Sequence, residues 1–236
     1  MRFAFVLTLA LALALPGAAL AQDIAIDLGG EGSLTLRTVQ LIALLTVLSL
    51  APGIAVTVTC FPFVVTVLSI MRQAIGLQAS PPNMLIVSLA LFLTYFVMEP
   101  VATAAWEAGI GPLTRGEMDV TDAIPAAVEP FRAFMAARVD ADTLQHLQDL
   151  RPEAEEDALS VLIPAFLLSE ISRAFQIGFL VFMPFLIIDM VAAAILMSMG
   201  MMMVPPAIVS LPFKLAFFVV VDGWTLVSGA LVRSYM

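Results

Sequence analysis

Methionine is the chemically distinctive side chain that this sequence concentrates most strongly in one place. Residues 197–203 contain five of the 14 methionines of the chain, namely Met197, Met199, Met201, Met202 and Met203. The methionine side chain is unbranched, flexible and polarisable, so a cluster of thioethers can pack against surfaces of varied shape. The residues alone leave two interpretations open: a turn between two membrane helices that happens to be rich in methionine, or an adaptable apolar surface with a function.

Charged side chains inside apolar segments are the second feature that could do chemistry. A charge at the centre of a bilayer costs about 2.5–3.5 kcal/mol on insertion scales, so such residues usually face protein or water and find partners. Glu170 and Arg173 are three residues apart, on one face of a helix, where they can pair. Lys214 and Asp222 are eight residues apart and can meet partners on the same side. We therefore expect packing against other subunits for the segments that contain these charges: Glu99, Glu170, Arg173, Asp189, Lys214 and Asp222.

Catalytic and metal-binding residues are scarce. The only cysteine is Cys60 and the only histidine is His146. One cysteine excludes an intrachain disulfide, and one histidine excludes a metal site built from several histidines. The sequence contains no recognisable arrangement of a nucleophile and a base. We therefore expect no enzyme and no metal or cofactor, with Cys60 acting as a small buried apolar side chain and His146 solvated.

The composition indicates a membrane protein or a largely buried assembly. The chain is 61% hydrophobic and 12% charged, with a mean hydropathy of +1.05, whereas soluble domains carry about 25% charged residues. The net charge of −9 is concentrated between Glu107 and Asp157, where 12 of the 19 acids and 4 of the 10 bases lie. The sequence has no basic stripe of the kind that nucleic-acid binding requires.

The N-terminus has the pattern of a secretory signal peptide. Arg2 precedes an apolar run over residues 3–15, and Ala19-Leu20-Ala21 provides a cleavage signal. As a helix the run would rise only about 20 Å, which is too short for a hydrocarbon core of about 30 Å. We therefore predict a signal peptide over residues 1–21, followed by a flexible exported segment over residues 22–37.

Two long apolar regions, 38–105 and 158–236, each have the pattern of a bent helical hairpin. Residues 38–71 would rise about 51 Å as one helix, far beyond the hydrocarbon core. Pro52-Gly53 and Pro62 are predicted to interrupt the first region, and Pro164, Gly178 and Pro184 to bend the second. Both regions contain Gly-x4-Pro-Pro, so we predict hinges at six residues: Gly76, Pro81, Pro82, Gly200, Pro205 and Pro206.

The acidic region 106–157 is predicted to be a small, mainly helical soluble domain between the hairpins. Apolar residues at helical spacing predict two short amphipathic helices, one around Phe131 and one around Leu144, with Thr143 as a candidate N-cap. A cleaved signal peptide places this region in the periplasm, although its four arginines favour the cytoplasm. We follow the signal peptide, because long loops cross the membrane largely regardless of charge. The predicted fold class is all-α and membrane-associated.

At this level of detail the sequence resembles the FliP family of flagellar biosynthetic proteins. The resemblance covers residue 39 to the C-terminus, and its motifs are long and ordered. They include Pro81-Pro82-Asn83, Ser169-Glu170, Met199-Gly200-Met201-Met202-Met203, Ser210-Leu211-Pro212-Phe213-Lys214 and Val221-Asp222-Gly223-Trp224. Phe63 stands where the family often has a basic residue, so a role for that charge is not expected in this chain.

The resemblance implies a pore-forming core subunit of the type III protein export gate, in the flagellar basal body of the bacterial inner membrane. It implies a pentamer that joins the subunits FliQ and FliR, works with FlhB and FlhA, and passes unfolded flagellar substrates. The multi-pass chain would use its methionine-rich loop as a gasket of the pore. Two alternatives are an injectisome export-gate subunit and a small-solute or ion transporter that uses Glu99, Asp189 and Asp222 as coupling groups.

Overall fold

The computed structural model describes residues 31–77, 80–153, 158–201 and 203–236, and these are helical without a β-strand. This confirms the predicted all-α class. The predicted signal peptide and residues 22–30 lie outside the described residues. The chain divides into two compact units, 1–49 and 50–236. The helix α2, Glu31–Thr57, begins within the segment 22–37 that the sequence predicted to be flexible.

The sequence predicted a first break at Pro52-Gly53, but the structure places it after Thr57. α2 continues through Pro52, and the next helix, α3, spans Phe61–Ile75. Two threonine hydroxyls donate hydrogen bonds to backbone carbonyls in the last turn of α2: Thr57 Oγ1 to Ile54 O at 2.8 Å, and Thr59 Oγ1 to Val56 O at 3.0 Å. Pro62 lies in the first turn of α3, where a missing N–H costs no helical hydrogen bond.

The second long helix runs without interruption from the membrane-type segment into the acidic region. α4, Asn83–Ala105, continues through a π-helical turn, η1, Trp106–Ile110, into the short helix α5, Gly111–Thr114. α6, Val120–Ala136, then packs back against α4 and η1. The approach is close: a Cβ on Gly109 would lie 2.3 Å from the carbonyl oxygen of Ala123. Only glycine fits at this position.

The C-terminal half consists of one very long helix and a bent pair. α8 spans Leu159–Ser198 and stays helical at Pro164, Gly178 and Pro184, so the predicted bends do not interrupt it. α9, Pro206–Val220, and α10, Gly223–Arg233, meet at an angle of 60°.

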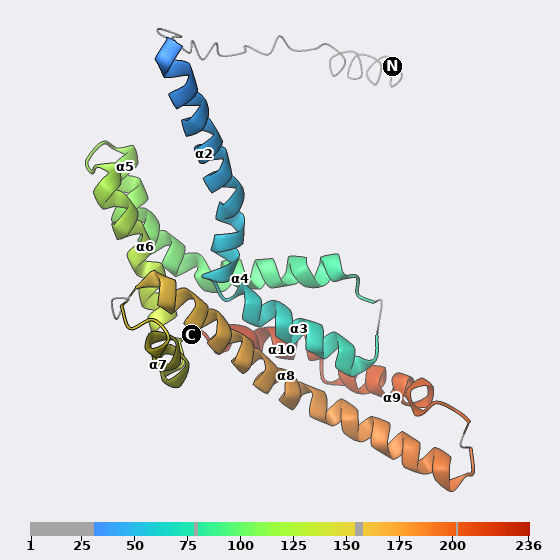
Figure 1. The fold of residues 1–236 in the computed structure, drawn as a ribbon. Helices are drawn as coiled ribbons and strands as arrows, with labels where there is room; N and C mark the ends of the chain where they lie inside the picture. The colour runs from blue at the N-terminus through green and yellow to red at the C-terminus, as the bar shows by residue number, and fades with distance from the viewer. Residues whose placement is uncertain (1–30, 78–79, 154–157, 202) are drawn as a thin grey trace, which may run out of the picture. The chain divides into compact units, whose positions relative to one another are not determined.

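The two predicted hairpins share one core. α3 and α8 run side by side (Figure 1), and α3 also contacts α4 and α9. The buried apolar side chains come from both halves of the chain and include Phe63 and Leu68 of α3, Ala174 and Phe185 of α8, and Phe218 of α9. Cys60 is fully buried in this core, as predicted, and His146 is exposed.

The acidic region contains the two amphipathic helices that the sequence predicts, α6 and α7, the latter spanning Ala141–Asp149. The N-cap of α7 is Asp140 and not Thr143: Asp140 Oδ1 accepts from the Thr143 N–H at 2.9 Å, so Thr143 supplies the donor that is capped. Met135 of α6 packs with Leu162 and Phe166 of α8. α6 therefore packs on the main helical body, and the periplasmic location of the region stays a prediction.

Three helical stretches of the described residues are long and apolar enough to cross a membrane: Thr38–Thr57, Asn83–Thr114 and Leu159–Ser198. The bent pair of α9 and α10 adds a fourth if the two helices are counted as one broken span.

Candidate functional site

The methionine-rich turn ends α8 and projects apolar side chains outward. Gly200 has φ +73°, and two hydrogen bonds close the helix end: Gly200 N–H donates to Met197 O at 3.1 Å, and Met201 N–H to Leu196 O at 3.0 Å. This pair of bonds is the Schellman motif, which needs a left-handed residue and therefore favours glycine. Met197 and Met199 are exposed and Met203 is 97% exposed. Met202 lies outside the described residues.

An apolar cavity of about 620 Å³ lies beside this turn, between the end of α8 and α9. Its lining contains only apolar side chains, among them Ile195, Met199, Met201 and Phe213. Two of the predicted gasket methionines thus line a hollow, while Met203 projects into the surroundings. The turn therefore borders an apolar cavity while Met199 and Met203 stay exposed.

The predicted hinge residues lie at the ends of helices. Gly76 caps α3 in the left-handed conformation, and Pro82 and Pro205 occupy the N-cap positions of α4 and α9. Pro81 precedes Pro82, and Pro206 begins α9. Arg72 ties the first connection together, because its Nη1 donates to Pro81 O at 3.3 Å and also to Asn83 Oδ1. Whether these turns act as hinges stays a prediction.

Lys214 of α9 contacts two other helices, α8 through Asp189 and α3 through the Ala74 carbonyl. Its Nζ lies 2.6 Å from Asp189 Oδ2 of α8 and donates to Ala74 O of α3 at 3.1 Å. Ser210 donates to the other Asp189 oxygen at 2.5 Å. The partner of Lys214 is thus Asp189, whereas Asp222 is exposed and takes a left-handed conformation at the start of α10. Glu99 is exposed as well.

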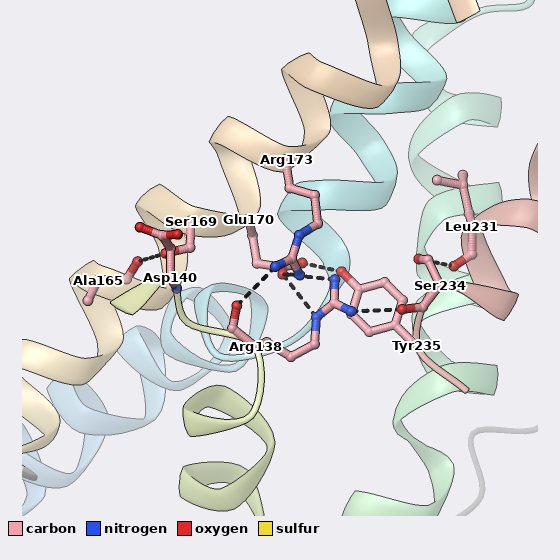
Figure 2. A network of polar contacts seen from close by, with 9 residues as sticks. All are labelled: Arg138, Asp140, Ala165, Ser169, Glu170, Arg173, Leu231, Ser234 and Tyr235. Atoms are coloured by element: carbon pink, nitrogen blue, oxygen red, sulfur yellow. Dashed lines mark hydrogen bonds and ion pairs between the residues drawn. The ribbon is translucent and has the colours of Figure 1, made fainter. Parts of the chain in front are cut away.

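Glu170 is the centre of a second, larger polar network (Figure 2). Its side chain is fully buried in α8. The expected pair with Arg173 forms, with Nη1 at 3.4 Å from Oε1. Arg138 approaches the same oxygen, donating from Nε at 3.2 Å and placing Nη2 at 3.1 Å outside hydrogen-bond geometry. The Tyr235 hydroxyl donates to Oε2.

Sequence reasoning did not find Arg138 and Tyr235 as partners of Glu170. They lie 32 and 65 residues from it, and helical periodicity carries no signal over such separations. Burial and the nearby carboxylate raise the pKa of Tyr235, which keeps its hydroxyl a donor.

At the N-cap of α7, the Thr143 backbone N–H holds the pKa of the Asp140 carboxyl below its usual value.

A metal-binding arrangement is absent from the described part of the chain: no three His, Cys, Asp or Glu side chains there lie close enough to hold an ion.

Comparison of the sequence with known proteins identifies the family of this chain. The sequence profile of the FliP family matches residues 44–231. The chain is 52% identical to the flagellar biosynthetic protein FliP of Caulobacter vibrioides, over 94% of this chain and 85% of that protein. It is 45% identical to the FliP of Agrobacterium fabrum, over 98% of each chain, and 45% identical to that of Bacillus subtilis, over 84% of this chain and 92% of that protein. The resemblance seen in the sequence motifs is thereby confirmed, and the chain belongs to the FliP family.

Proposed function

We propose that this chain is a pore-forming core subunit of the flagellar type III protein export gate and that residues 197–203 form the gasket of its pore. Its family makes it a component of the flagellar export apparatus, and its apolar helices make it an inner-membrane protein. The relatives that it resembles carry a flagellar name, which favours a flagellar over an injectisome role.

The assembly that we propose is a pentamer of this chain with FliQ and FliR, contacting FlhB and FlhA. Exposed apolar side chains along α4 and α8, such as Phe92, Tyr95, Phe179 and Leu180, supply surface for such contacts. Large exposed apolar surfaces mark protein or membrane interaction sites. The acidic region would face the periplasm, and unfolded flagellar proteins would pass through the shared pore.

The observation that carries the gasket is the exposure of Met197, Met199 and Met203 at a turn whose backbone is fixed by the Schellman bonds. A fixed backbone holds the thioethers in place, while their three rotatable bonds let them follow the shape of a passing chain. A ring of such side chains makes many weak dispersion contacts. At rest it would form an apolar constriction that blocks ions by excluding water.

The test is a triple replacement of Met201, Met202 and Met203 by glycine in the intact export complex. We expect ion leak across the inner membrane to rise severalfold, because glycine removes three of the five methionine side chains from the constriction. Replacement of the same three residues by leucine keeps the apolar volume and should largely preserve the seal. Met84→Gly serves as the matched control, since Met84 is an exposed methionine of α4 and lies far from the methionine-rich turn in the sequence.

Two readouts keep the interpretation clear. Co-purification of FliQ and FliR with each variant checks that the complex still assembles. An unchanged ion leak together with normal secretion in the glycine variant would refute the gasket.

A further inference from the structure

The C-terminal tail, residues 234–236, folds back onto a buried carboxylate far away in the sequence. The Tyr235 hydroxyl donates to Glu170 Oε2. Arg138 reaches the tail from the other side: its Nη1 donates to Ser234 O at 2.7 Å, and its guanidinium carbon lies 3.9 Å from the centre of the Tyr235 ring. Figure 2 shows Arg138 enclosed between Glu170 and the tail. The tail thus holds an arginine that belongs to another element.

Arg138 lies in the linker between α6 and α7, and α8 holds the same linker at two further points. The Asp140 N–H donates to Ser169 Oγ at 2.9 Å, and Arg173 Nη2 donates to Arg138 O at 3.4 Å. α7 itself has no fully buried residue. Its half-buried Leu144 packs against the cluster of Met135, Leu162 and Phe166, but half-buried side chains contribute only part of the free energy of full burial, so the linker contacts add to the hold of α7 on α8.

The tail is seated among aromatic side chains from two more helices. The Tyr235 ring meets Phe63 of α3 edge-on at 5.5 Å and stacks on Phe134 of α6 at 6.0 Å between centres. Aromatic pairs at such distances add to the gain from burial alone. Removal of the tail would open the junction of α3, α6 and α8 and would take away one donor of Glu170.

We propose that residues 234 and 235 form a strap that holds the α6–α7 linker, and through it α7, on α8, and that α7 undocks when the strap is released. This inference is independent of the proposed pore, since it concerns only contacts within one chain. The strap acts through Arg138, which it fixes by a hydrogen bond to Ser234 O and by stacking on the Tyr235 ring, and the hydrogen bond from the Tyr235 hydroxyl to Glu170 keeps that ring in place. Loss of the strap leaves α8 contacts from Ser169 and Arg173, so the linker loosens without unfolding the core.

The test uses hydrogen–deuterium exchange on the purified full-length chain. Tyr235→Phe keeps the ring and removes the hydroxyl that donates to Glu170. We expect amide exchange in α7 to accelerate about tenfold or more, the range for a lost hydrogen bond to a charged group. Exchange in α9 should stay unchanged. Tyr95→Phe is the matched control, because Tyr95 is an exposed tyrosine of α4.

A shortened chain gives a second measurement. Deletion of residues 234–236, which removes the whole strap, should accelerate exchange in α7 further, whereas deletion of Met236 alone should leave it unchanged, since that side chain is exposed. Unchanged α7 exchange both in Tyr235→Phe and in the chain that lacks residues 234–236 would overturn the proposal of a strap. Equal acceleration in α7 and α9 would overturn it too, because the tail would then stabilise the fold as a whole and not the linker.

Discussion

A buried carboxylate is stable only through the donors that surround it, and Glu170 has three: two guanidinium groups and a phenol hydroxyl. The helical spacing of Glu170 and Arg173 would by itself give a weak surface-type pair, since Arg173 is partly exposed. Arg138 and Tyr235 convert this local pair into a network that joins three parts of the chain. Removing one member of such a network leaves the others buried without a partner, which costs more than the pair contributes.

Glu170→Gln should therefore lower the free energy of unfolding by about 3–5 kcal/mol, the usual effect of breaking a buried ion pair. The glutamine has the same size, so the loss reports on charge and not on packing. Denaturant unfolding of the detergent-purified chain measures the difference. Glu99→Gln is the control, because Glu99 is exposed, and its effect should be small. Equal stability of the two variants would contradict the role given to Glu170.

At the scale of elements, the close contact between η1 and α6 depends on one missing side chain. A Cβ on Gly109 would approach two backbone atoms, Ala123 O at 2.3 Å and Ala127 N at 2.7 Å. Backbone atoms of a packed helix cannot move aside as the end of a flexible side chain can. The long helix that begins as α4 thus keeps α6 against it only where glycine allows the approach.

Gly109→Ala should destabilise the chain by about 1–3 kcal/mol through overpacking. Gly53→Ala is the matched control, since a Cβ there meets nothing within 4 Å and alanine favours a helix by about 1 kcal/mol over glycine. Thermal unfolding of the two variants should therefore shift in opposite directions. A Gly109→Ala variant as stable as the parent would show that α6 is not packed so closely on η1.

At the scale of the whole molecule, α8 is too long to be explained by a bilayer. Its 40 residues rise about 60 Å, twice the thickness of a hydrocarbon core of about 30 Å. Apolar exposed side chains continue along it from Leu168 to Met197. A stretch of that length needs cover from protein beyond the lipid, which agrees with the proposed assembly.

Spin labels placed along α8 of the assembled complex test this directly. In a Cys60→Ser background, single cysteines at Leu168, Phe179, Met190 and Met197 sample the exposed side of the helix. We expect lipid-dissolved oxygen to reach labels over no more than about 20 consecutive residues, the length that spans a bilayer. Full oxygen access at all four positions would contradict protein cover of α8.

The sequence by itself determined the helical class, the apolar segments, the methionine-rich turn between α8 and α9 and the Glu170–Arg173 pair. These features depend on composition and on spacings of three or four residues, which the geometry of a helix fixes locally. The tertiary structure alone decided that Lys214 meets Asp189 and Ala74, 25 and 140 residues away, and that Tyr235 closes on Glu170. It also decided that both halves share one core, because α3 buries its apolar face mainly against α8 of the other half. Contacts of that kind depend on which helices pack together, and residue spacings within one helix carry no information about its packing partners.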